Sequence, residues 1–308
     1  MNFKITLENN VLRVENLESV DQANVWFAVI DINCNLVKDL IWGSFPPYSH
    51  ILSELAEPGP ECTGYRIEVF KEEGHMETLY ATDIIWGDIN KKYYFHNSTR
   101  ELNYMPFIDL FYNDEYDGKI VISEDDVVYD LGANVGVFTM WALSANAKQI
   151  YSFEPTNYLI PSLYETFHQH HPRVVIFDKA ITGRHEIKQF NMGRHSVGNS
   201  LYTDLGNPNA VNVECINIEQ FIKENGLQQP TLMKVDIEGS EYEMFDSLSN
   251  EFINSVKTWI VEFHYNYETK AEDIIHRLLN LGFSVEMKKG DVLKNFEEKC
   301  MGTFIAKK

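Results

Sequence analysis

Several acidic residues of this chain directly follow apolar stretches, and they are its candidates for binding a cofactor or taking part in catalysis. Asp130 closes an apolar, β-branched run, and a turn of small residues and a helix-like segment follow it. A strand, a tight glycine turn and a helix N-terminus together form a binding place for a nucleotide-like cofactor. Glycine lets the backbone turn sharply and lets a ligand come close. We therefore predict cofactor contacts along this turn, at Asp130, Gly132, Ala133, Asn134 and Gly136.

The composition of the turn separates one cofactor class from another. The dinucleotide fingerprint reads G-x-G-x-x-G, whereas this chain has Asn134 where the second glycine would stand, and it contains no Walker A sequence. A carboxylate at the end of the strand, that of Asp130, would repel a phosphate and attract an ammonium group. S-adenosylmethionine carries an ammonium group and a sulfonium. The turn therefore favours S-adenosylmethionine, and a NAD-dependent oxidoreductase is the disfavoured alternative.

Two further acids follow the next two predicted strands. Glu154 comes after the apolar run 149–153, in the position from which an acidic side chain accepts hydrogen bonds from ribose hydroxyls. Asp178 comes after the run 174–177, where the amino group of an adenine would need an acceptor. We predict that both side chains contact the cofactor.

A third group of polar residues follows two later strands. Asp236 and Glu238 come after the strand predicted over residues 232–235, and His264 follows Glu262 at the end of another. A reacting hydroxyl group is weakly acidic and benefits from a general base, for which Asp236, Glu238 and His264 are the candidates. Asp236 could instead face the positive methionine end of the cofactor. We predict a metal-free site; the alternative is a divalent metal such as Mg²⁺, shared by Asp236, Glu262 and an acceptor diol.

Four motifs in this order resemble those of the FkbM-type methyltransferases, which are class I enzymes that use S-adenosylmethionine. The motifs cover residues 130–136, 153–155, 234–241 and 261–264, and the resemblance extends over roughly residues 120–308. It implies methylation of a hydroxyl group, with a sugar, nucleotide sugar or glycan as the expected acceptor. The alternatives are a small natural product or lipid head group as acceptor, or an inactive binding protein of the same fold.

Alternating strands and helices must position these residues from Asp126 onward. Strands are predicted over residues 127–131, 149–153, 174–177, 232–235, 259–263, 283–287 and 302–306, and helices over 135–143, 158–170, 218–224, 240–248 and 271–281. Such alternation with short connections predicts a doubly wound, mostly parallel sheet, a Rossmann-like α/β fold. The last two strands predict an antiparallel hairpin at its edge.

The sequence before this region reads differently. Short alternating runs separated by turn residues predict a small all-β sandwich domain over residues 1–85. Residues 86–120 are rich in aromatic side chains and are expected to be a linker or a cover over the active site. The methyltransferase domain is then expected to span residues 121–308.

Composition limits the partners. The chain of 308 residues has 26 Lys and Arg against 46 Asp and Glu, a formal net charge of −20. Such a surface repels phosphate backbones, so we predict no nucleic-acid partner. The start of the sequence lacks a signal-peptide pattern, no run is long enough to span a membrane, and none of the four cysteines forms a C-x-x-C pair. These features predict a cytoplasmic protein, and a homo-oligomer is compatible with them.

Two polar segments remain. The region 187–216 reads as a β-rich insertion, and its side chains could bind sugar hydroxyls, at Asn191, Arg194, His195, Asn199, Ser200 and Asn209. Ordinary turn residues are the alternative interpretation. The histidines between His168 and His171 are expected at an exposed helix end, without a metal-binding partner in the sequence.

Overall fold

The computed structural model divides the chain into two compact units, Met1–Tyr112 and Asn113–Lys308. It describes the side chains of Phe95, Leu110, Tyr116, Leu201 and the ranges 118–191, 210–264, 271–288 and 302–308, together with the backbone of the strands between residues 3 and 96 and of Met301. The two units are treated separately below. The predicted domain limits at residues 85 and 120 stay a prediction.

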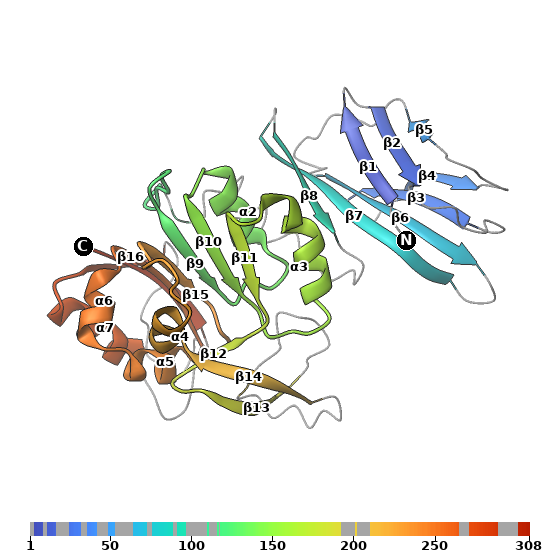
Figure 1. The fold of residues 1–308 in the computed structure, drawn as a ribbon. Helices are drawn as coiled ribbons and strands as arrows, with labels where there is room; N and C mark the ends of the chain where they lie inside the picture. Colours follow the sequence, from blue (N-terminus) through green and yellow to red (C-terminus); the bar gives the residue numbers. More distant parts are fainter. Residues whose placement is uncertain are drawn as a thin grey trace. The chain divides into compact units, whose positions relative to one another are not determined.

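A seven-stranded sheet forms the centre of the second unit, in the order β11-β10-β9-β15-β16-β18-β17. Its strands are β9 (Val127–Leu131), β10 (Gln149–Phe153), β11 (Val174–Phe177), β15 (Leu232–Val235), β16 (Thr258–His264), β17 (Ser284–Met287) and β18 (Met301–Lys307). Strands β9, β10, β11, β15 and β16 pair in parallel, and β18 pairs antiparallel with both β16 and β17. The predicted doubly wound sheet with a terminal antiparallel pair is confirmed (Figure 1).

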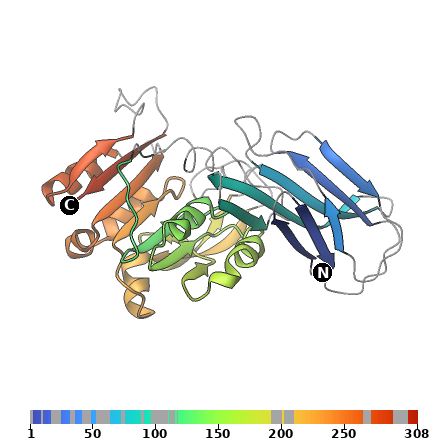
Figure 2. The same ribbon diagram turned by 90° about the horizontal axis from the view of Figure 1, so that it is seen from above.

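Helices occupy the connections between these strands. They are α2 (Val137–Ser144), α3 (Ile160–Phe167), α4 (Ile218–Glu224), α5 (Glu241–Ser247), α6 (Asn250–Ser255) and α7 (Ala271–Asn280). Helix α3 is followed by a 3₁₀ turn, His168–His170, whose side chains are exposed as predicted. In Figure 2 the sheet can be followed from its green strands near the glycine turn to its red strands near the C-terminus.

Three helix assignments differ from the prediction by two residues or more. Helix α3 spans Ile160–Phe167 instead of the predicted 158–170, and a 3₁₀ turn takes the place of its last residues. Helix α2 begins two residues later than expected, because Gly136 adopts a left-handed conformation with φ of 88° and ends the turn. Helix α6 was not predicted from the sequence. It begins after Ser249, whose hydroxyl accepts a hydrogen bond from the Phe252 amide at 3.0 Å, a typical N-terminal cap.

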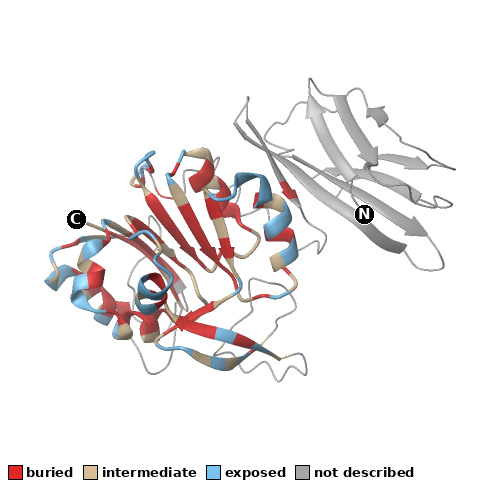
Figure 3. Cartoon of the chain, in the orientation of Figure 1, coloured by how far each residue is buried: buried red, intermediate tan, exposed pale blue. Residues whose placement is uncertain are grey.

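The sheet buries one face in the main apolar core. Alternate residues of the central strands, among them Tyr129, Phe153, Met233 and Trp259, belong to one buried cluster with side chains of helices α4, α5, α6 and α7. Figure 3 shows β9 and β10 as almost entirely buried strands. Since side chains alternate along a strand, the intervening residues point to the opposite face.

That opposite face carries a row of polar side chains across three neighbouring strands. Asp130 on β9 lies in register with Ser152 on β10 and with Lys234 on β15. Polar groups buried in so apolar a sheet need hydrogen-bond or ion-pair partners among themselves, because burying an unpaired charge is costly. The row leads to the carboxyl ends of the strands, where ligands bind in open α/β sheets.

A small second sheet follows β11. It consists of β12 (Ala180–Thr182), β14 (Val211–Asn217) and β13 (Glu186–Phe190), in that order. The predicted β-rich insertion is therefore present in the described part of this region. The loop residues Arg194, His195, Asn199, Ser200 and Asn209 lie outside the described residues.

The elements described between residues 3 and 96 of the first unit are strands, in agreement with the β-rich character predicted there. Its two antiparallel sheets have the orders β1-β2-β5 and β4-β3-β6-β7-β8. The strands are β1 (Phe3–Glu8), β2 (Val11–Asn16), β3 (Val25–Asp31), β4 (Leu36–Ile41), β5 (Ser49–Leu52), β6 (Gly64–Glu72), β7 (Met76–Asp88) and β8 (Lys91–His96). Among the residues that the structure describes in either unit, no helix combines the length and the apolar character that crossing a bilayer would require.

Candidate active site

The glycine turn after β9 is held against two neighbouring segments. The amides of Gly132 and Ala133 both donate hydrogen bonds to the Phe153 carbonyl, at 3.0 and 2.9 Å. A Cβ on Gly132 would lie 1.7 Å from the carbonyl oxygen of Asp236, and φ of this glycine is +83°. Gly132 therefore allows the turn to touch the loop after β15, which is a contact within the protein.

The second glycine of the turn serves a different contact. A Cβ on Gly136 would come within 2.6 Å of the Phe167 ring on helix α3. The close approach at this glycine is thus made by an aromatic side chain of the protein. The cofactor-binding roles of Gly132, Ala133 and Gly136 stay predictions.

Glu154 is fixed in place by backbone amides. Its side chain accepts a hydrogen bond from the Asn134 amide at 2.7 Å and another from the Thr156 amide at 2.8 Å. The residue is 5% exposed, and burial raises the pKa of its carboxyl group although these hydrogen bonds oppose the shift. A carboxylate has about four acceptor positions, so this orientation leaves positions for the hydroxyls of a ligand.

Asp130 is buried beneath the turn. It is 0% exposed, accepts a hydrogen bond from the Thr139 hydroxyl at 2.7 Å and lies 3.7 Å from the Lys234 ammonium group. Thr139 also shares a hydrogen bond of 2.6 Å with Ser152. Burial raises the pKa of Asp130, and the charge of Lys234 opposes that shift. The predicted attraction between Asp130 and a cofactor ammonium group stays a prediction.

Lys234 is the residue that sequence reasoning missed on this side of the site. Its ammonium group donates to the Gly132 carbonyl at 2.9 Å and to the Asp236 carboxylate at 3.0 Å. Burial alone would lower the pKa of Lys234, but the charges of Asp236 and Asp130 outweigh burial and raise it. A lysine within a buried strand, between Met233 and Val235, was the available signal, since such a charge needs acidic partners.

A pocket connects the predicted cofactor residues with the predicted catalytic ones. It has an empty volume of about 610 Å³, which includes space open to solvent. Its polar and glycine lining comprises Gly132, Asn134, Glu154, Thr156, Lys179, Asp236, Glu238 and Ser240, and its apolar lining comprises Phe153, Pro155, Ala180, Ile181, Phe190, Leu201 and Ile237. Asp130, Asp178 and His264 are not among these described lining residues.

Asp178 has a different neighbour from the one predicted. Its carboxylate pairs with the Lys179 ammonium group at 2.8 Å, and its side chain is 65% exposed. Lys179 rather than Asp178 lines the pocket. The adenine-binding role of Asp178 stays a prediction.

His264 lies between two carboxylates. Its Nδ1 is 3.0 Å from Oε1 of Glu241, and its Nε2 is 3.4 Å from Oε2 of Glu238. The same Glu241 oxygen accepts hydrogen bonds from the Ile237 and Gly239 amides, each 3.2 Å long. Glu241, which was not predicted, therefore fixes both the imidazole ring and the loop after β15.

The charges in this cluster shift one another's pKa values. Burial would lower the pKa of His264, but the hydrogen bond and charge of Glu241, together with Glu238, raise it to about 9. Burial raises the pKa of Glu238 to about 7, against the opposing charge of His264. Glu238 also has a positive φ of 53°, an uncommon backbone conformation for a residue with a side chain. The predicted catalytic side chains thus form one electrostatic cluster.

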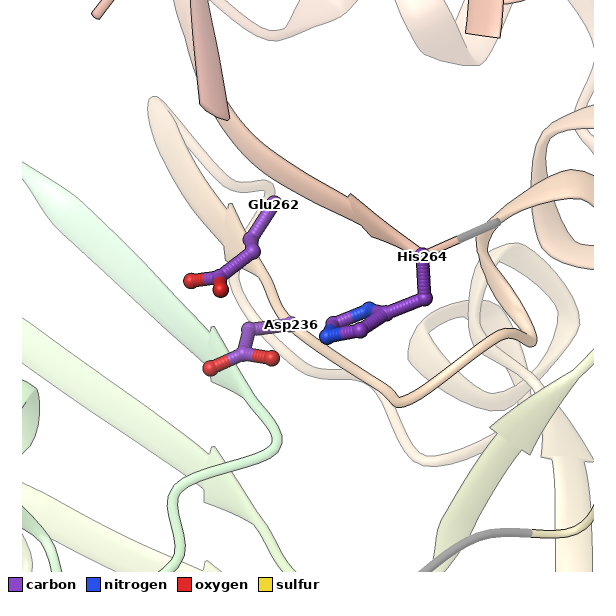
Figure 4. Close-up of side chains that lie close together, drawn as sticks. All are labelled: Asp236, Glu262 and His264. Carbon is purple, nitrogen blue, oxygen red and sulfur yellow. The ribbon is translucent and has the colours of Figure 1, made fainter. Parts of the chain in front are cut away.

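Asp236, Glu262 and His264 converge at the ends of β15 and β16. One ligand atom from each side chain lies within 4.8 Å of one from each of the others, and all three residues are partly buried. Figure 4 shows the Glu262 carboxylate above that of Asp236 and the imidazole ring of His264 directed at both. The sequence predicted that these strand ends meet, because neighbouring parallel strands end at the same edge.

Solved structures with distant similarity to this chain include proteins from Streptococcus mutans and Pyrococcus abyssi. A putative methyltransferase from Streptococcus mutans, SMU.1697c in complex with SAH, has a TM-score of 0.38 and 11% identity and covers 67% of this chain and 100% of its own. Trm5b from Pyrococcus abyssi has a TM-score of 0.37 and 12% identity, covering 77% of this chain and 61% of its own. Similarity at this level carries no conclusion about activity.

Two curated proteins match the sequence. The hexuronic acid methyltransferase AglP of Haloferax volcanii is 24% identical over 172 residues, which are 54% of this chain and 66% of AglP. The AMB antimetabolite synthetase AmbE of Pseudomonas aeruginosa is 21% identical over 290 residues, which are 79% of this chain and 13% of AmbE. The chain therefore spans less than two thirds of the length of either relative.

A family model decides the assignment. The model described as "Methyltransferase FkbM domain" matches residues 130–285, about half of the chain. The matched range begins at Asp130 and includes the glycine turn, Glu154 and the Asp236, Glu262 and His264 cluster. The chain belongs to the FkbM methyltransferase family.

Proposed function

We propose that this protein transfers a methyl group from S-adenosylmethionine to a hydroxyl group of a sugar or glycan. One observation carries the proposal. A single pocket is lined both by Asn134 and Glu154, which follow β9 and β10, and by Asp236 and Glu238, which follow β15, the neighbour of β9 on its other side. Such a pocket can hold a cofactor on one side and an acceptor on the other. The family assignment supports the same reaction class.

The cofactor side fits an adenosine group. Glu154 faces the pocket with an orientation fixed by two backbone amides, which suits a carboxylate that accepts hydrogen bonds from ribose hydroxyls. Ile181 and Phe190 supply apolar walls for a flat base. S-adenosylmethionine, when bound, supplies a methyl group on a positively charged sulfur. The acidic side chains around the pocket suit that positive charge.

The acceptor side must orient a hydroxyl and remove its proton. The hydroxyl oxygen forms a bond to the methyl carbon while the carbon–sulfur bond breaks, and the products are a methyl ether and S-adenosylhomocysteine. The proton released from the hydroxyl group passes to a side chain of the protein. We assign orientation and proton removal to Asp236, Glu238 and His264, with Asp236 and Glu238 lining the pocket itself.

A sugar acceptor is supported by one relative and by the chemistry of the site. AglP is a hexuronic acid methyltransferase, and its similarity to this chain covers 172 residues. Carboxylates and imidazoles bind hydroxyl groups well. A small natural product is the second candidate acceptor, because the other matching relative, AmbE, is an antimetabolite synthetase.

The test has two steps. Isothermal titration of the full chain with S-adenosylmethionine should give one site per chain, and absence of binding would remove the proposal. Incubation with the cofactor and a panel of hexuronic acids, nucleotide sugars and glycans, followed by mass spectrometry, should then show one added methyl group on an oxygen. Methylation of natural-product hydroxyls alone would favour the second candidate.

A further inference from the structure

We propose that Asp236, Glu262 and His264 bind one divalent cation of the Mg²⁺ or Mn²⁺ kind, which holds the acceptor through two neighbouring oxygen atoms. The role of the cation in catalysis rests on the proposed function, whereas its binding does not. This proposal reverses our sequence-based preference for a metal-free site.

The positions of the three ligands suit such an ion. Glu262 and His264 are two residues apart on β16 and so point to the same face of the sheet, and Asp236 follows the paired strand β15. Their ligand atoms lie within 4.8 Å of one another. Around an octahedral Mg²⁺, neighbouring ligand atoms are about 3.0 Å apart and opposite ones about 4.2 Å, so the three side chains would draw closer together on a bound ion.

The orientation of His264 is an independent sign of a metal ligand. Glu241 is 0% exposed and its Oε1 lies 3.0 Å from Nδ1 of the ring, which directs Nε2 away from Glu241. Histidine ligands of metals are commonly held in this way by a carboxylate on their other nitrogen. Nε2, which lies 3.4 Å from Oε2 of Glu238, is therefore the ring nitrogen that we assign to the cation. Oε2 of Glu241 is a buried oxygen without a hydrogen-bond partner in the described part of the chain, so its negative charge is only partly compensated.

The balance of charge around the cluster also favours a cation. Five carboxylates gather in this region. Those of Asp130, Asp236, Glu238 and Glu241 lie within 4.0 Å of Lys234 or His264, and an oxygen of Glu262 lies within 4.8 Å of ligand atoms of Asp236 and His264. Among these contacts, the Lys234 ammonium group is shared between Asp130 and Asp236, and the His264 ring, which is neutral when it binds a metal, is shared between Glu238 and Glu241. The negative charge of these carboxylates attracts a divalent cation to the three ligand side chains.

The ligand set predicts the kind of acceptor. Two carboxylates and one imidazole suit Mg²⁺ or Mn²⁺, and three protein ligands leave three positions of a six-coordinate ion for other oxygens. A vicinal diol or a 2-hydroxy acid can fill two adjacent positions, whereas an isolated hydroxyl fills one. Glu238, which lines the pocket but lies outside the ligand set, is left to receive the proton.

Metal binding is measured directly on the full chain after treatment with EDTA. Isothermal titration with MnCl₂ should show one site per chain, and pulsed EPR of the bound Mn²⁺ should show coupling to one imidazole nitrogen. His264→Ala should remove the nitrogen coupling, and His264→Ala and Glu262→Gln should each weaken binding by at least about tenfold. The matched controls, His276→Ala and Glu165→Gln, change exposed residues on α7 and α3 and should bind Mn²⁺ like the unmodified protein.

Two results would overturn the proposal: no Mn²⁺ site in the unmodified protein, or equal Mn²⁺ affinity in His264→Ala and His276→Ala. Circular dichroism of each variant shows whether it is folded, and Glu262→Gln at a partly buried position provides a second reading if His264→Ala unfolds. Titration of the same metal-free protein with S-adenosylmethionine separates the two proposals. If the protein binds the cofactor but not Mn²⁺, the proposed function stands and the cation proposal is wrong. If it binds Mn²⁺ but not the cofactor, the cation site stands and the proposed function is wrong.

Discussion

The two sides of the pocket stabilise their acids by different means. On the proposed cofactor side, Glu154 is held by the backbone amide of Thr156, two residues further on, and by that of Asn134 in the turn after the neighbouring strand β9. On the acceptor side, Asp236, Glu238 and His264 are held by other charged side chains. Neutral backbone donors fix a shape, whereas mutually dependent charges respond to a proton, an ion or a substrate. The first arrangement suits binding and the second suits chemistry.

Removing Lys234 should have the largest effect, since its ammonium group joins both sides. Lys234→Met leaves Asp130 buried without its cationic partner, and we expect a loss of about 3–5 kcal/mol in the free energy of unfolding, measured by urea denaturation. Adding Asp130→Asn should recover part of this loss. The control Lys257→Met, at an exposed position, should change the value by less than about 0.5 kcal/mol. Equal stability of the two lysine variants would show that the two sides are not joined electrostatically.

Gly132→Ala should separate the two sides by steric means. The new Cβ would meet the Asp236 carbonyl at 1.7 Å in a backbone conformation with φ of +83°. We expect about 3 kcal/mol of destabilisation together with loss of cofactor binding, measured by denaturation and titration. Gly226→Ala is the matched control, because φ there is +60° but nothing lies within 4 Å of the new Cβ. That variant should lose only about 1 kcal/mol, and a similar loss in both would mean that the contact with Asp236 is unimportant.

His264→Ala tests the acceptor side alone. We expect turnover to fall by about 100-fold or more while the affinity for S-adenosylmethionine stays within about twofold, because His264 does not line the described pocket. Turnover is measured by formation of S-adenosylhomocysteine, and affinity by titration. A parallel fall in cofactor affinity would contradict the division of the pocket into two sides.

Glu154→Ala tests the cofactor side and should have the smallest effect. Removing a buried acceptor from its hydroxyl partners should weaken S-adenosylmethionine binding by about 1–3 kcal/mol. Glu165→Ala, at an exposed position on α3, is the control and should bind normally. An unchanged affinity in Glu154→Ala would contradict the ribose-binding role.

The sheet was predictable because its central strands read as short apolar runs ending in acids. Parallel strands covered on both faces give such runs, and their common edge brings Glu154, Asp236 and His264 into one region. The contact between His264 and Glu241 was not predictable. It spans 23 residues of sequence and depends on how α5 packs beside β16, which periodicity does not specify.

The glycine turn shows a second limit of sequence reasoning. Gly132 and Gly136 were interpreted as positions where a side chain would keep a ligand away from the backbone. The structure places protein atoms there, the Asp236 carbonyl and the Phe167 ring. Pattern alone does not distinguish space kept for a ligand from space filled by another segment of the same chain.

The hydrogen bonds of Lys234 have a thermodynamic consequence. One ammonium group holds the Gly132 carbonyl of the cofactor side and the Asp236 carboxylate of the acceptor side. A ligand that draws Asp236 toward itself therefore alters the restraint on the glycine turn. Thermodynamic linkage requires the effect to be mutual: if the cofactor changes the affinity for that ligand by some factor, the ligand changes the affinity for the cofactor by the same factor. Under the proposed function, Lys234 is the contact through which the cofactor and the acceptor would each alter the affinity of the other.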